Sequence, residues 1–137
     1  KDCKLIVIDP VSAYMVDADS HNNSEVRGIL APLAKLAEKY GVAIVLVTHM
    51  SKGNDARALY RAMGSIAFVA AVRSAQIVVR DPAKRDRRLF LPLKSNLGSP
   101  KGGLAYEILD GKVQWDPAPV LVNADDVLAH DQGKGGG

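Results

Sequence analysis

Two polar residues stand at the ends of apolar runs and are the first candidates for chemistry in this sequence of 137 residues. Asp9 closes the run KLIVIDP (4–10), and His49 closes the run VAIVLVTH (42–49). A carboxylate directly after a buried strand is typical of a residue that holds Mg²⁺, directly or through water, beside a nucleotide phosphate. An imidazole at the end of the next strand can sense such a phosphate or polarise water. Each signal is weak alone, because many α/β folds end a strand in Asp and many strand-end histidines are structural.

The two runs must form parallel strands if their ends are to meet. Both are apolar without alternation, which is the pattern of strands buried on both faces. Between them, apolar residues recur at spacings of three and four over 24–40, which predicts an amphipathic helix that Gly41 ends and that Pro32 kinks or shortens. Strand, helix and strand predict a βαβ unit with parallel strands and a right-handed crossover. Ligands bind beyond the carboxyl ends of such strands, where Asp9 and His49 would meet.

The pattern changes after the βαβ unit. A stretch rich in small residues over 64–75 predicts a helix, and Asp110-Gly111 predicts a hairpin turn. Short strand patterns precede and follow that turn, at 75–81, 88–96, 104–109 and 112–116. The expected fold class is α/β, with a parallel βαβ sheet continued by antiparallel strands and a C-terminal β-hairpin. A domain over 1–116 is expected, followed by a flexible extension over 117–137 that ends in DQGKGGG.

Composition narrows the class of protein. A hydrophobic fraction of 47% excludes a wholly disordered chain, and one cysteine (Cys3) excludes both an intramolecular disulfide framework and a cysteine-rich zinc site. No apolar run approaches the roughly 20 residues of a membrane helix, so a soluble cytoplasmic protein without a membrane partner is expected. The net charge of +3 permits a nucleic-acid partner without requiring one.

Basic residues gather in two segments of the sequence. Residues 80–88 (RDPAKRDRR) form the first, and Lys52, Arg57 and Arg61 belong to the second, over 50–63. Either segment can contact DNA phosphates, and either can be a solvated turn or loop. The charges alone leave both interpretations open.

The order and spacing of five segments resemble the RecA-like ATPases of the plasmid RepA hexameric helicase type. The resemblance spans about residues 4–109, in LIVIDPVSAYM (5–15), NNSEVRGILAPLAKLAEKYGVAIVLVTHMSKG (22–53), YRAMGSIAFVAAVRSAQIVVRDP (60–82), LPLKSN (91–96) and GLAYEI (103–108). It implies a RecA-like core in a homo-oligomeric ring hexamer, with ATP and Mg²⁺ held between neighbouring subunits. It also implies a parent protein that couples ATP hydrolysis to DNA binding or unwinding.

The resemblance assigns roles to particular residues. Asp9 resembles the Walker B aspartate that holds Mg²⁺, and His49 looks like the nucleotide sensor at the end of the next core strand. Arg73 is similar to an arginine finger that reaches the ATP of a neighbouring subunit, and Lys94 matches a basic residue near the phosphates in related ring helicases. The sequence departs from the pattern at Asn96, where some ring helicases place a finger arginine.

The resemblance also assigns a role to the basic residues of the segment 50–63. That segment occupies the place of a DNA loop in the central channel, so Lys52, Arg57 and Arg61 would contact DNA. Two other parts of the family's site are missing from the printed sequence, namely a GxxxxGK[ST] phosphate loop and a catalytic glutamate upstream of Asp9.

These departures suggest the C-terminal portion of a RecA-like core. Such a portion is expected to be catalytically incompetent by itself and to bind no ATP or Mg²⁺ tightly. Two alternatives stay open. The first is a non-catalytic DNA-binding or oligomerisation module with a degenerate RecA-like fold, and the second is an unrelated α/β domain whose polar strand ends are accidental.

Overall fold

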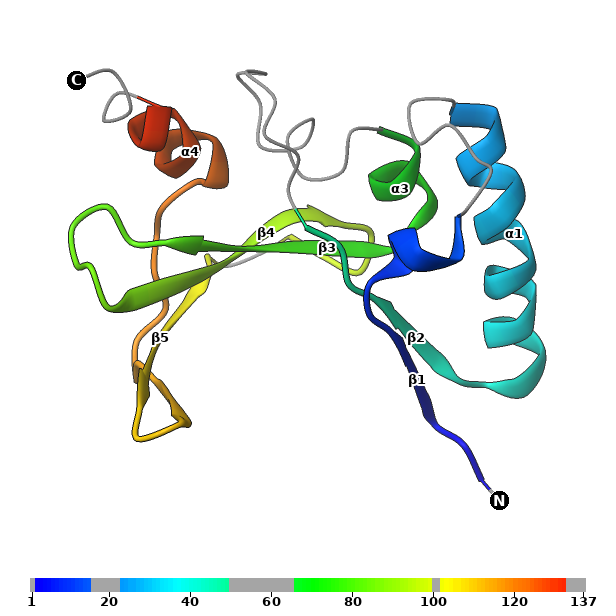
Figure 1. Ribbon diagram of the computed structural model, residues 1–137, viewed down its shortest axis with the longest axis horizontal. Coiled ribbons are helices and arrows are strands. Elements are labelled where there is room, and N and C mark those ends of the chain that lie inside the picture. The colour runs from blue at the N-terminus through cyan, green and yellow to red at the C-terminus, as the bar shows by residue number, and fades with distance from the viewer. Residues whose placement is uncertain (1, 16–22, 50–65, 100–101, 133–137) are drawn as a thin grey trace. The chain divides into compact units, whose positions relative to one another are not determined.

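The computed structural model describes residues 2–15, 23–49, 66–99 and 102–132, which fall into two compact units (Figure 1). The first unit comprises Lys1–Asn54 and Leu59–Val72, and the second comprises Asp55–Ala58 and Arg73–Gly137. In chain order the elements are β1 (Leu5–Ile8), the 3-10 helix η1 (Val11–Tyr14), α1 (Asn23–Tyr40), β2 (Ala43–Leu46), α3 (Ile66–Ala71), β3 (Ser74–Arg80), β4 (Arg87–Ser95), β5 (Leu104–Leu109), β6 (Lys112–Trp115) and α4 (Ala124–Gln132). In these ranges no helix has the length and apolar character that a membrane crossing requires.

The first unit is built on the parallel pair β1–β2, which confirms the predicted arrangement of these strands. Leu5 lies opposite Ala43, and Ile8 lies opposite Leu46. Helix α1 covers one face of the pair. The hydrophobic core of the first unit contains side chains from α1, both strands and the short helices η1 and α3. Its buried residues are Val11, Val26, Leu30 and Phe68, and Ile8, Met15, Leu33 and Leu46 pack against them.

Pro32 lies inside α1 and does not move the start of the helix, which begins at Asn23. Proline removes the N–H that would bond to the carbonyl oxygen of Gly28, four residues earlier. Because Gly28 and Pro32 are both exposed, water can reach that oxygen. The helix then ends at Gly41, whose positive φ of 61° is the conformation that favours glycine.

The second unit is an antiparallel sheet in the order β3-β4-β5-β6 with α4 packed on one face. Alternate strand residues enter the core with the apolar side of α4, and these buried residues are Ile77, Val79, Leu89, Leu91, Ala105, Ala124, Val127 and Leu128. The predicted turn is confirmed, because Asp110 (φ 50°) and Gly111 (φ 73°) join β5 to β6 with the two positive φ values of a tight hairpin.

The structure differs from the expected fold in two places. The parallel and antiparallel strands form separate sheets of two and four strands, not one continued sheet. Helix α4 also occupies residues of the C-terminal segment that was expected to be flexible. It forms there because Asn123 Oδ1 accepts a hydrogen bond from the N–H of Asp125 at 3.1 Å, and because Ala124, Val127 and Leu128 share one apolar side.

A network of charged side chains closes the end of the second unit where β3 meets β4. Arg87 Nη1 lies 2.9 Å from Asp81 Oδ2, and its Nη2 lies 2.5 Å from Asp116 Oδ2. The hydrogen bond to Asp116, which is the larger cause, and the hydrogen bond to Asp81 raise the pKa of Arg87. Nearby, a hydrogen bond from Lys84 to Glu107 raises the pKa of that lysine.

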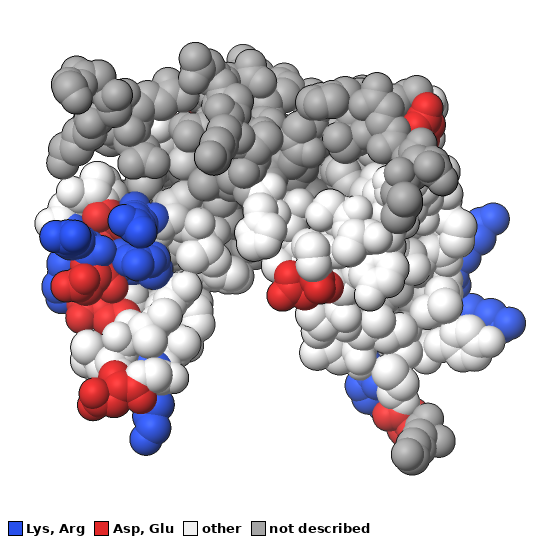
Figure 2. All heavy atoms as spheres, in the orientation of Figure 1, with Lys and Arg blue, Asp and Glu red and all other residues white. Residues whose placement is uncertain are grey.

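The carboxylates of this network neutralise part of the positive charge of the segment 80–88. Figure 2 shows acidic and basic side chains interspersed where the β3–β4 hairpin turns. Lys84 and Arg87 therefore have carboxylate partners within the unit, whereas Arg80 and Arg85 are exposed.

We expect Arg87→Ala to destabilise the second unit by about 2–4 kcal/mol, because it leaves the carboxylate of Asp81, which is 8% exposed, without its cation. Arg85→Ala removes the same side chain from an exposed position of the same turn and should change stability by less than about 0.5 kcal/mol. Chemical denaturation followed by the fluorescence of Trp115, the single tryptophan, measures both variants. Equal denaturation midpoints for the two variants would show that the network contributes nothing.

Candidate functional site

The backbone of Val47, directly after β2, fixes the position of Asp9 at the carboxyl edge of the parallel pair. The N–H of Val47 donates to the carbonyl oxygen of Ile8 at 2.9 Å, and the carbonyl oxygen of Val47 accepts from the N–H of Val11 at 2.8 Å. A parallel ladder would normally take its second bond from residue 10, but Pro10 has no N–H, so Val11 supplies it. Asp9 therefore lies between two backbone hydrogen bonds to one residue of the neighbouring strand, and its side chain is exposed.

His49 lies beyond the same edge of the sheet. It follows the end of β2 by three residues and is exposed, while Thr48 before it is half-buried. Since Ile8 pairs with Leu46 in a parallel register, the chain leaves both strands in the same direction, toward Asp9 on one side and His49 on the other. The structure thus brings the two predicted residues of the first unit to one edge, where a carboxylate and an imidazole are open to a ligand.

The donor chemistry of this edge suits a nucleotide with its metal ion. An exposed carboxylate is a hard oxygen ligand of the kind that Mg²⁺ takes once or twice, with waters and phosphate oxygens completing the shell. In the described part of the chain, no three His, Cys, Asp or Glu side chains gather as they would in a metal cage made by protein alone. Asp9 is the residue that would hold Mg²⁺, and Mg²⁺ would supply charge neutralisation at the phosphates.

The two remaining predicted site residues lie in the second unit, at one end of the β3–β4 ladder. Arg73 is exposed and comes directly before β3, and its carbonyl oxygen accepts a hydrogen bond from the N–H of Asn96 at 2.8 Å. Lys94 is half-buried and pairs with Ala75. Cross-strand partners share a face, as do positions two residues apart along a strand, so Arg73 and Lys94 belong to the same face of this end of the sheet.

The predicted DNA-contacting residues are not among the residues that the structure describes. Lys52, Arg57 and Arg61 all fall within 50–65, which lies outside the described ranges. Their role stays a prediction from the sequence.

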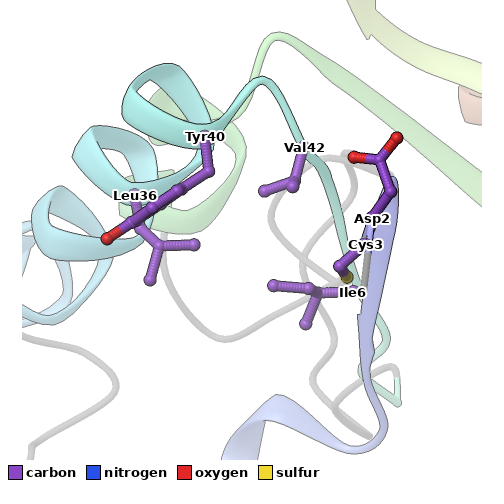
Figure 3. A pocket seen from close by; sticks show the side chains of 6 residues that line it. All are labelled: Asp2, Cys3, Ile6, Leu36, Tyr40 and Val42. Carbon is purple, nitrogen blue, oxygen red and sulfur yellow. The ribbon is translucent and has the colours of Figure 1, made fainter.

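A hollow in the first unit lies at the other end of the parallel strands (Figure 3). It has a volume of about 250 Å³ and is lined by residues before or at the start of each strand and by the last turns of α1, namely Asp2, Cys3, Ile6, Leu36, Tyr40 and Val42. Ile6 and Val42 point toward α1, where Leu36 and Tyr40 lie. The lining mixes polar and apolar surface and is remote along the strands from Asp9 and His49, so the hollow is no part of the candidate site.

Comparison with known families gives a match in the N-terminal part of the chain. Residues 1–55 match a family described as an AAA domain. The match covers β1, α1 and β2 with Asp9 and His49, and it ends before Arg73 and Lys94. None of the curated proteins compared with the chain matches it. Over these 55 of its 137 residues, the chain is therefore similar to an ATPase-like, nucleotide-binding domain.

Proposed function

We propose that the first unit supplies the Mg²⁺-facing and phosphate-sensing part of the nucleotide site in a RecA-like ring ATPase of the RepA helicase type. The observation that carries this proposal is the position of Asp9 and His49 at the same carboxyl edge of a parallel pair. The match of residues 1–55 to an AAA domain supports the coarser part of it, an ATPase-like domain. In the intact parent, ATP hydrolysis would be coupled to DNA binding or unwinding.

Each residue of the first unit has a separate part in this proposal. Asp9 would hold Mg²⁺, directly or through water, and the ion would neutralise charge at the nucleotide phosphates. His49, on the neighbouring strand, would donate a hydrogen bond to the terminal phosphate or to the attacking water. Its position after β2 would let it sense loss of that phosphate and pass the change to the segment that follows, which includes Lys52.

The second unit would act on the site of a neighbouring subunit in a homo-oligomeric ring. Arg73 is exposed, as a residue must be if its phosphate belongs to another chain. Lys94 lies on the same face of the same ladder end and would add a second cation near the phosphates. Guanidinium groups supplied in this way stabilise transition-state charge and commonly account for 10³-fold or more in rate, as an order of magnitude.

The alternative is a non-catalytic DNA-binding or oligomerisation module. It differs from the first proposal at the GxxxxGK[ST] loop, whose backbone amides and lysine normally cradle the β- and γ-phosphates and which the alternative would not need. The two proposals share the DNA contact and differ in nucleotide turnover by the parent.

The chain of 137 residues should bind Mg·ATP only weakly and hydrolyse it no faster than the background rate, because it lacks that phosphate loop. Asp9→Ala should weaken even this binding, whereas Asp86→Ala, which removes an exposed carboxylate of the second unit, should not. Calorimetric titration with Mg·ATP and phosphate-release assays measure both. Micromolar affinity that Asp9→Ala abolishes would mean that the site is more complete than we propose, and equal affinities for the two variants would remove Asp9 from it.

DNA binding through the segment 50–63 should be salt-sensitive. Replacing Lys52, Arg57 and Arg61 by Ala should flatten the slope of log affinity against log salt by about one unit for each phosphate that no longer meets a cation. A matched variant removes three exposed cations of α1 instead, at Arg27, Lys35 and Lys39. Fluorescence anisotropy of labelled DNA measures the slopes. If the segment 50–63 is only a solvated loop, both variants will bind DNA at low salt with the same affinity as the original chain.

A further inference from the structure

One face of the antiparallel sheet in the second unit carries aromatic and aliphatic side chains that α4 does not cover. The core residues of β3, β4 and β5 face α4, and the residues that alternate with them point to the other side, as do the β6 residues that pair with those of β5. Several of the latter are large, apolar and exposed, with exposed fractions of 48% for Val78, 45% for Leu104, 58% for Ile108 and 53% for Trp115. We call this side, opposite α4, the open face.

Strand register places two cations and two aromatic rings in one row across the open face. Arg80 pairs with Arg88, Arg88 pairs with Tyr106, and Tyr106 pairs with Trp115. Since neighbouring strands are about 4.8 Å apart, this row is roughly 14 Å long. It runs from the β3 edge of the sheet, where the charge lies, to the β6 edge, where the rings lie.

The rings form one cluster around Trp115. The Tyr106 and Trp115 centroids are 5.0 Å apart at an interplanar angle of 57°, and Phe90, half-buried in the adjacent row, meets Trp115 edge-on at 6.2 Å and 82°. Such packing holds Trp115 in a defined orientation at the β6 edge while leaving about half of it exposed. A rigid, half-exposed indole is suited to stacking against another flat ring.

Charge distinguishes the open face from the covered one. On the covered face, Arg87 and Lys84 are held by Asp81, Asp116 and Glu107. On the open face, the described strand positions include Arg80 and Arg88 and no Asp or Glu. Two like charges directly opposite each other on neighbouring strands repel, and an anion placed beside both of them would relieve that repulsion.

We propose that the open face binds single-stranded nucleic acid, with bases stacking on Trp115 and Tyr106 and backbone phosphates contacting Arg80 and Arg88. Stacking platforms beside a positive track are how sheets bind unpaired nucleotides without sequence preference. A duplex fits poorly because its bases are already stacked. This proposal rests on the proposed function only for the class of its ligand, nucleic acid. Binding at the open face requires neither the nucleotide site nor the segment 50–63.

Trp115 itself reports on this site, because it is the single tryptophan of the chain. Titrating the whole chain with oligothymidylate or oligouridylate should quench its fluorescence to saturation, and a DNA duplex of equal length should quench it less. Comparing the two oligonucleotides shows whether DNA or RNA is preferred. Saturable binding in anisotropy that leaves Trp115 fluorescence unchanged would overturn the proposal.

Variants test the two halves of the row separately. Tyr106→Leu should weaken single-strand binding roughly 5- to 100-fold. The double variant Arg80→Ala and Arg88→Ala removes two cations that lie outside the buried core, together with the hydrogen bonds that Arg88 Nη1 donates to the carbonyl oxygens of Arg85 and Arg87. It should lower the salt slope by about 0.7 for each phosphate that it leaves without a cation, whereas the double variant Arg27→Ala and Lys35→Ala should not. Unchanged binding in the Arg80 and Arg88 variant would overturn the proposal even if Tyr106→Leu fails to fold.

Two further measurements distinguish a site on the open face from a site in the segment 50–63 and from a contact between copies of the chain. In the triple variant of Lys52, Arg57 and Arg61, single-stranded nucleic acid should still quench the fluorescence of Trp115. Complete loss of this quenching would assign single-strand binding to the segment 50–63 and overturn a site on the open face. Without nucleic acid, any self-association that sedimentation detects should leave the emission of Trp115 unchanged. A shift of that emission on self-association would assign the face to a contact between copies and overturn the proposal.

Discussion

The proposed nucleotide chemistry depends on the backbone pairing between β1 and β2 and its continuation at Val47. Because the two strands are parallel, both leave the sheet at the same edge, and Val47 holds the chain on both sides of Asp9 through Ile8 and Val11. An antiparallel pair would have put Asp9 and His49 at opposite ends of the sheet. The packing of α1 on one face maintains the pair, since two strands alone are marginally stable in water.

The second unit stabilises its sheet on one face only. Helix α4 and the network around Arg87 occupy the covered face, where apolar burial and paired charges combine. The open face has neither a helix nor a carboxylate in its described strand positions, and its rings pack against one another. This asymmetry is common in antiparallel sheets, but the exposed side is usually polar. Here it is aromatic and basic, which is the reason for assigning it a ligand.

The sequence predicts those parts of the fold that depend on local pattern. Unbroken apolar runs predicted β1 and β2, apolar spacing predicted α1, and Asp110-Gly111 predicted the last hairpin, since each is set by neighbouring residues. Helix α4 was missed, although the sequence holds signals for it in Asn123 as an N-cap and in the apolar residues Ala124, Val127 and Leu128 at the helical spacing i, i+3, i+4. The split into two sheets could not be predicted, because periodicity shows that a residue is in a strand and not which strand lies beside it.

The same limit applies to the sites. Asp9 and His49 are predicted because each ends an apolar run, and placing both at one edge of the sheet needs only the parallel rule. The open face was missed because Arg88, Tyr106 and Trp115 are on three strands, and only their register brings them into one row. That Arg73 and Lys94 share a ladder end likewise depends on the pairing of β3 with β4.

The most direct test of the central claim is a map of paramagnetic broadening by Mn²⁺ with ATP, recorded by nuclear magnetic resonance on the whole chain. Mn²⁺ replaces Mg²⁺ at oxygen ligands and broadens nearby signals even when binding is weak. The account predicts that signals of Asp9, Thr48 and His49 broaden first, while those of Cys3 and Tyr40 at the opposite end of the strands remain sharp. Broadening that spares Asp9 and His49, or that begins at the hollow beside Tyr40, would contradict it.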